Sequence, residues 1–126
     1  MLDSFIGLLE AQNIYMSAAN VAMKVLELAQ QIPRDKANNI AGQMIHYSST
    51  VCHNLLEAWK NRTDQAVFMD KLNNASIEAV EVQSRIRAAI DAKFLKPEAA
   101  EKIAKTYEDL VDKIGSILKN PNEQAK

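Results

Sequence analysis

The chain has 126 residues, of which 48% are hydrophobic and 25% charged, with a net charge of −1. This length fits one domain with a substantial core, and the near-neutral charge argues against a protein that grips nucleic acid through its overall charge. No run approaches the ~18 apolar residues of a membrane span, and the acidic, interrupted segment 1–10 is not typical of a signal peptide, so we expect a cytoplasmic protein without a membrane partner.

The first helix is predicted from about Asp3 to Gln31. Its apolar residues recur at alternating steps of four and three, which places them on one stripe of a helix: Ala11, Tyr15, Ala18, Ala22, Val25, Ala29 and Ile32. A second stripe beside it holds Ile14, Val21 and Leu28. This face is wider than one partner helix requires, and the surplus apolar surface favours self-association.

A second helix follows Pro33, with residues 34–36 in its first turn and its end near Lys60. Its apolar stripe comprises Ala37, Ala41, Met44, Ser48, Val51, Leu55 and Ala58. Asn54 and Glu57 stand beside leucines, and partial burial would require them to be hydrogen-bonded. We expect them to tie this helix to a neighbouring helix or subunit, and Gly42 to allow close helix approach.

Thr63 or Asp64 is the expected N-cap of the third helix, which ends at Ala92 or Lys93. Its stripe comprises Phe68, Leu72, Ala75, Ala79, Val82, Ile86 and Ala89. The fourth helix starts at Pro97, ends near Lys119 and carries the stripe Ala100, Ile103, Tyr107, Leu110, Ile114 and Ile117. We expect residues 1–119 to form the domain and residues 120–126 a flexible C-terminal tail.

Four amphipathic helices with short joins can bury their stripes only against each other. The sequence therefore predicts an all-α protein, an antiparallel up-down-up-down four-helix bundle.

Residues that carry chemistry are few. A di-iron site in such a bundle needs Glu-x-x-His on two helices, but His46 and His53 are preceded three positions earlier by Gln43 and Thr50. Cys52, the single cysteine, lacks an orienting base and is expected to be a packed thiol. No glycine-rich phosphate loop is present. We expect no catalytic residue, no metal and no cofactor, and thus no enzyme.

Basic residues gather where the first and third joins meet in an up-down-up-down bundle: Arg34, Lys36, Arg85, Arg87, Lys93 and Lys96. Asp35, Asp91 and Glu98 lie among them, so the positive excess is small. Two interpretations stay open. This end is a solvated surface, or it contacts the phosphates of RNA or DNA, with an effect that a ring of copies would multiply.

A set of residues spread over all four helices carries a family resemblance. It comprises Tyr15 and Ala18, Ile32-Pro33, the series Gln43, Thr50, Asn54 and Glu57, then Phe68, Ser76, Glu81 and Gln83, and Phe94-Leu95. Over 15–119 the chain resembles the bacterial four-helix-bundle proteins encoded in intervening sequences of 23S ribosomal RNA genes. Relatives of that family include the accessory variability proteins of diversity-generating retroelements.

The resemblance implies a non-enzymatic homo-oligomer, often a pentameric ring. For the retroelement relatives it implies binding to nucleic acid and to a reverse transcriptase. It also suggests helix-packing or interface roles for Gln43, Thr50, Asn54, Glu57, Ser76 and Glu81. Departures from the pattern are Ile45 and His46, where family members often carry arginine, Ala58 in place of glycine, and a net charge that is not basic.

Two functions follow as hypotheses. The first is an oligomeric adaptor that binds RNA or DNA weakly through the basic bundle end, or binds a protein that handles nucleic acid. The alternative is a structural or protein-interaction homo-oligomer with no nucleic-acid role.

Overall fold

The computed structural model describes the backbone of residues 2–33 and 39–119, and the side chains within these ranges from residue 13 onward. It contains four helices: α1 (Leu2–Gln31), α2 (Ile40–Lys60), α3 (Gln65–Asp91) and α4 (Pro97–Lys119). Several predicted features lie outside the described residues: Arg34 and Lys36 of the basic end, Ala37 of the second stripe, and the tail 120–126.

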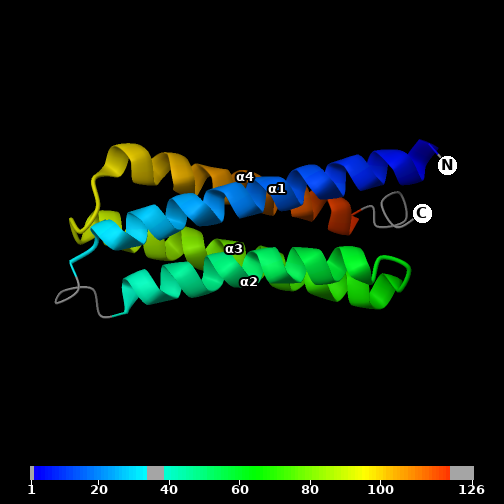
Figure 1. Ribbon diagram of the computed structural model, residues 1–126, viewed down its shortest axis with the longest axis horizontal. Coiled ribbons are helices and arrows are strands. Elements are labelled where there is room, and N and C mark those ends of the chain that lie inside the picture. The colour runs from blue at the N-terminus through cyan, green and yellow to red at the C-terminus, as the bar shows by residue number, and fades with distance from the viewer. Residues whose placement is uncertain (1, 34–38, 120–126) are drawn as a thin grey trace.

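Successive helices run antiparallel, as the colour gradient in Figure 1 shows. α1 packs against α2 and α4, and α3 packs against the same two helices. The α1–α2 and α3–α4 joins lie at one end of the bundle, and the α2–α3 turn lies at the other (Figure 1). The predicted all-α, up-down-up-down four-helix bundle is confirmed.

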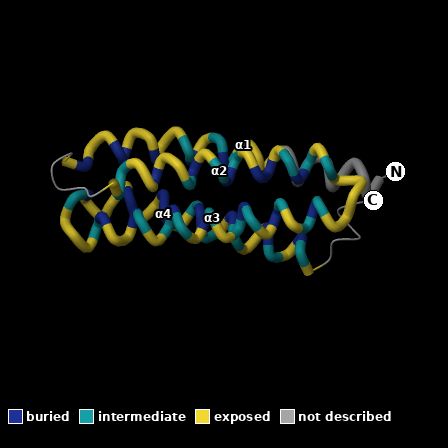
Figure 2. Tube along the Cα trace, turned by 90° about the horizontal axis from the view of Figure 1, so that it is seen from below, coloured by how far each residue is buried: buried dark blue, intermediate teal, exposed yellow. Residues whose placement is uncertain are grey.

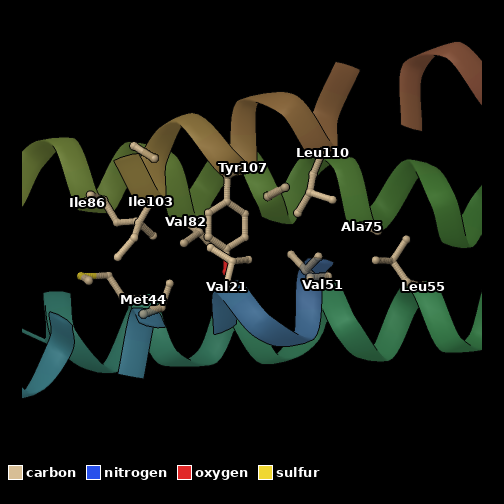
Figure 3. Packing of buried hydrophobic residues seen from close by; sticks show 14 of the residues in the cluster. Val21, Met44, Val51, Leu55, Ala75, Val82, Ile86, Ile103, Tyr107 and Leu110 are labelled. Carbon is tan, nitrogen blue, oxygen red and sulfur yellow. The ribbon is translucent and has the colours of Figure 1, made fainter. Parts of the chain in front are cut away.

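Buried residues line the inside of the bundle along its length (Figure 2). Every predicted stripe residue of α3 and of α4 is buried, as are Met44, Ser48, Val51, Leu55 and Ala58 of α2. Tyr107 reaches from α4 across the centre of the core toward Val21 of α1 (Figure 3). The three-four spacing therefore places three of the four helices correctly around the core.

In α1 the predicted main stripe is wrong in part. Tyr15 is 38% exposed, whereas Ile14, Val21 and Leu28 from the second stripe are buried. Ala18 and Val25 of the main stripe are buried together with the second stripe, whose aliphatic side chains gain more from burial than a tyrosine that can keep its hydroxyl in water. The helix is therefore rotated so that Tyr15 lies at the edge of the core.

The helix ends confirm two predictions. α2 spans Ile40–Lys60, and Asn39 before it adopts a left-handed conformation with φ of 68°; the first turn predicted at residues 34–36 lies outside the described residues. The Asp64 carboxylate caps α3 by accepting the Val67 N–H at 3.3 Å. Pro97 is the first residue of α4, as predicted.

Candidate interaction surfaces

A polar seam runs between α2 and α3, beside the core. In it the side-chain amide of Asn54 donates a hydrogen bond to Glu78 Oε1 at 3.0 Å. Asn54 is only 8% exposed, so this bond satisfies an amide that water barely reaches. The expectation that Asn54 ties the second helix to a neighbour is confirmed, with α3 of the same chain as the neighbour.

In the part of the seam that lies nearer the two joins, Arg85 is the residue with the most contacts. Its Nε donates to Gln43 Oε1 at 3.3 Å, its guanidinium pairs with Glu81, and its Cζ lies 5.2 Å from the centre of the Tyr47 ring. These three contacts hold the guanidinium between two helices. Arg85 is therefore a packing residue within the chain, and Gln43 and Glu81 are its partners.

The other residues of the family pattern have smaller roles. The Thr50 hydroxyl donates to the Tyr47 carbonyl oxygen at 3.0 Å within α2. Glu57 lies 3.9 Å from Lys60 on the same helix, and Ser76 is half-buried on α3. Of the six pattern residues, the structure thus brings Gln43, Asn54 and Glu81 into the seam.

Glu78 and Tyr47 were not predicted as seam residues, although the sequence contains the signal. Tyr47 and Asn54 are seven residues apart, and so are Glu78 and Arg85. A heptad spacing keeps polar side chains on one flank of a helix, next to the apolar stripe. Two such polar stripes on consecutive antiparallel helices indicate a seam between them.

The basic end is less cationic than the count of its residues indicates. Arg87 Nε lies 4.0 Å from Glu101 and Arg87 Nη2 lies 3.9 Å from Glu108, so this guanidinium bridges α3 and α4. Lys93 and Lys96 are exposed in the α3–α4 join. Of the four predicted basic residues that the structure describes, these two lysines are the ones without a carboxylate at ion-pair distance.

Large apolar side chains are exposed on one flank of both α1 and α2. On α1, Asn13, Ser17 and Lys24 line hollows shared with α4. With 3.6 residues per turn, Tyr15 and Leu26 point to the opposite flank of α1, toward α2. On α2, Tyr47 and Asn54 face α3, so Ile45 and Leu56 lie on the flank toward α1.

We call this surface the α1/α2 face and define it by Tyr15, Ala19, Ala22, Leu26, Gly42, Ile45, Ser49 and Leu56. Charged side chains are scarce around it. Residues 39–56 contain no Asp, Glu, Lys or Arg, and residues 13–31 contain only Lys24 and Glu27. The exposed fractions of Tyr15, Leu26, Ile45 and Leu56 lie between 37% and 46%. The face is thus an apolar, uncharged strip along two helices.

Buried titratable groups in the core are arranged to stay neutral. Tyr107 is fully buried, and burial together with nearby Cys52 raises the pKa of its hydroxyl. That hydroxyl has no hydrogen-bond partner among the described residues. The neighbouring Ser48 hydroxyl donates to the Ile45 carbonyl oxygen at 2.9 Å. Burial also raises the pKa of the Cys52 thiol. A protonated thiol is a poor nucleophile.

Within the described ranges, no group of three or more His, Cys, Asp or Glu side chains is placed to hold a metal ion. None of the helices over their described residues is long and apolar enough to cross a membrane.

Comparison with known proteins identifies related chains. A crystal structure of a protein of unknown function from the S23 ribosomal protein family, from Bacteroides thetaiotaomicron VPI-5482, superimposes with a TM-score of 0.79 and 20% sequence identity. The match covers 87% of this chain and 98% of the other. At this identity the likeness shows the shared fold. No curated protein matches the chain. The model of the 23S rRNA-intervening sequence protein family matches residues 10–116, and the chain therefore belongs to that family.

Proposed function

We propose that this protein is a non-enzymatic, cytoplasmic homo-oligomeric adaptor that associates with copies of itself through the α1/α2 face. The observation that carries this proposal is the apolar, uncharged character of that face. Charged residues are depleted at the cores of protein interfaces because burying an unpaired charge is costly. By contrast, α4 carries exposed Glu101, Lys105 and Asp109, which are suited to water.

The shape of the face supports a second helix from another copy as the occupant. Ala19, Ala22 and Ser49 are small and lie between the bulkier Tyr15, Leu26, Ile45 and Leu56. A Cβ at Gly42 would meet none of the described residues within 4 Å, so no contact with them requires glycine there. Glycine within a helix costs about 1 kcal/mol relative to alanine, and close approach by a partner would explain its presence.

The family resemblance favours a closed ring of five copies. Such a ring needs a head-to-tail contact, in which the α1/α2 face of one copy meets a different surface of the next copy. Because α1 and α2 are adjacent, the same face offers two helices to a neighbouring copy and leaves the ends of the bundle open. Those ends are where an adaptor would contact a further partner.

A double substitution to glutamate tests whether the α1/α2 face is the interface between copies. The variant Leu26→Glu/Ile45→Glu should shift the protein to a monomer in light scattering coupled to size-exclusion chromatography. The matched control is Ile77→Glu/Val80→Glu, which places two glutamates on exposed apolar positions of α3, 53% and 46% exposed. The control should keep the oligomeric mass, and both variants should keep the helical circular dichroism of the native protein. An unchanged mass for the first variant would overturn the proposal.

Binding of RNA or DNA at the basic end is a second candidate function, and one observation favours it. Lys93 and Lys96 are exposed in the α3–α4 join, without carboxylate partners among the described residues, at the end that also holds the α1–α2 join. Arg85 and Arg87, however, are held by carboxylates. The geometry therefore favours the oligomer without a nucleic-acid role over the nucleic-acid adaptor.

A salt-titrated binding assay with structured RNA and duplex DNA distinguishes the two. Several phosphate contacts would make the affinity fall steeply between ~50 and ~200 mM salt. Lys93→Glu/Lys96→Glu should then abolish binding, whereas the control Lys105→Glu/Lys113→Glu on α4 should not. Absence of binding at the low-salt end would leave the protein-interaction oligomer.

A further inference from the structure

We propose that the groove between α1 and α4 is a binding site for a small molecule that carries a phosphate group on an apolar body. The groove has a volume of about 520 Å³ and lies toward the end of the bundle that holds the two joins. Small-molecule sites in proteins typically measure ~300–1,000 Å³ and combine apolar walls with a few polar groups. Its size alone thus suits a ligand of modest dimensions.

The inner part of the groove is apolar. Leu28 of α1 and Ile103 of α4 line it and are 4% and 8% exposed, and Ala99 lines it beside them. An apolar body resting on Ala99 and on the small exposed parts of Leu28 and Ile103 would remove their remaining apolar surface from water.

Three lysine side chains line the same groove from three different segments. Lys24 comes from α1, Lys96 from the α3–α4 join and Lys102 from α4. None of them lies at ion-pair distance from a carboxylate of the described residues, in contrast to Lys60 and Lys105 elsewhere. The first turn of α4 adds the positive end of a helix dipole on the same side. These groups suit a compact anion with several acceptor oxygens.

Glu27 and Glu98 also line the groove and restrict which anion fits. Three ammonium groups against two carboxylates leave one net positive charge. A phosphate monoester can sit among the lysines and keep its apolar body away from both carboxylates. A nucleic-acid strand laid along the groove would bring successive phosphates close to Glu27 or Glu98, so the charges favour a small ligand.

The site is independent of the proposed oligomer. The groove uses the flank of α1 that faces α4, whereas the α1/α2 face uses the opposite flank. Association through the α1/α2 face would therefore leave the groove open. Failure of one proposal does not imply failure of the other.

Phenyl phosphate is a suitable probe because it joins a phosphate to a flat apolar ring. Titrated into the full-length protein at ~50 mM salt, where surface charges are weakly screened, it should shift the methyl NMR signals of Leu28 and Ile103 in a saturable manner. Inorganic phosphate supplies only the phosphate group, and benzyl alcohol supplies an aromatic ring without a phosphate. Each should bind at least ~ten-fold more weakly than the probe, since ~1.4 kcal/mol of lost interaction corresponds to a factor of ten.

The variant Lys24→Ala/Lys102→Ala should weaken phenyl phosphate binding at least roughly ten-fold, because each charge-assisted hydrogen bond is worth about that factor. The matched control Lys60→Ala/Lys105→Ala removes the same charge from other surfaces and should bind as the native protein does. The proposal is overturned if no saturable shift occurs, if both variants lose affinity equally, or if benzyl alcohol binds as well as the probe. It is also overturned if a short RNA displaces the probe at lower concentration than inorganic phosphate does.

Discussion

Asn54 and Glu78 form a hydrogen bond that joins α2 to α3 beside the core, at 3.0 Å from Nδ2 to Oε1. The bond satisfies one carboxylate oxygen and leaves Glu78 Oε2 buried without a partner among the described residues. The Glu78 carboxylate therefore has one oxygen that accepts a hydrogen bond and one that does not. Removal of the Asn54 amide would leave both oxygens without a donor among the described residues.

Asn54→Ala should lower the free energy of unfolding by about 1–3 kcal/mol, the cost of a buried acceptor that loses its donor. Urea denaturation measures the change, and Asn73→Ala, at an exposed position of α3, is the matched control with less than about 0.5 kcal/mol expected. In a Glu78→Leu background the same Asn54→Ala change should cost less, because no carboxylate is left to satisfy. Equal costs in both backgrounds would show that the hydrogen bond contributes nothing.

Tyr107→Phe should leave the free energy of unfolding unchanged or raise it slightly. The hydroxyl is buried and makes no hydrogen bond to the described residues, so its removal relieves a desolvated polar group while the ring keeps its packing. Tyr107→Ala should instead cost about 3–5 kcal/mol, as expected for a large side chain deleted from a core. A loss above ~1 kcal/mol for Tyr107→Phe would show that the hydroxyl makes a hydrogen bond in the folded protein, to the Ser48 hydroxyl or to a buried water.

Alkaline pH should destabilise the protein through the same residue. Burial raises the pKa of the Tyr107 hydroxyl, so above about pH 10, the usual tyrosine value, the unfolded state loses this proton while the folded state keeps it. The unfolded state then binds fewer protons, and stability falls as pH rises, by up to about 1.4 kcal/mol per pH unit. Below that pH both states are protonated and the residue contributes no pH dependence.

Comparison of native protein with Tyr107→Phe by chemical denaturation between pH 8 and pH 11 isolates this contribution. The variant should lose less stability than the native protein above about pH 10. Cys52→Ala is the companion variant, because burial raises the pKa of that thiol and its effect begins at a lower pH. Parallel stability curves for native protein and Tyr107→Phe would contradict the prediction.

The regular spacing of apolar residues was sufficient to predict the fold. In α3 the seven stripe residues from Phe68 to Ala89 are all buried, since one stripe dominates that helix. In α1 two stripes overlap, and the spacing cannot say whether Tyr15 or Ile14 faces the core. That choice depends on how the helix packs on α2 and α4, which is tertiary information.

The candidate surfaces were predictable only in part. The sequence indicates that Asn54 needs a partner, but Glu78 is identified as that partner only when the register of α2 against α3 is known. Likewise, the count of basic residues near the joins does not reveal that Arg85 and Arg87 are held by carboxylates. Ion pairs between helices depend on rotation and register, and neither is encoded in local spacing.

Lys93→Gly should raise the free energy of unfolding by about 1 kcal/mol. Lys93 follows α3 with a left-handed φ of 65°, and the next two N–H groups, of Phe94 and Leu95, both donate to the Ala89 carbonyl oxygen. This arrangement closes the helix, but a residue with a Cβ pays roughly 1–2 kcal/mol for a left-handed backbone that glycine adopts freely. Thermal denaturation of the variant measures the gain.

Lys93→Ala is the control for that substitution, because it removes the same charge and keeps the Cβ. Its free energy of unfolding should change by less than about 0.5 kcal/mol. If both variants were stabilised equally, repulsion among the cations of the bundle end, and not backbone strain at residue 93, would be the cause. The pair of variants therefore also measures how much positive charge the bundle end carries, which bears directly on its capacity to bind phosphates.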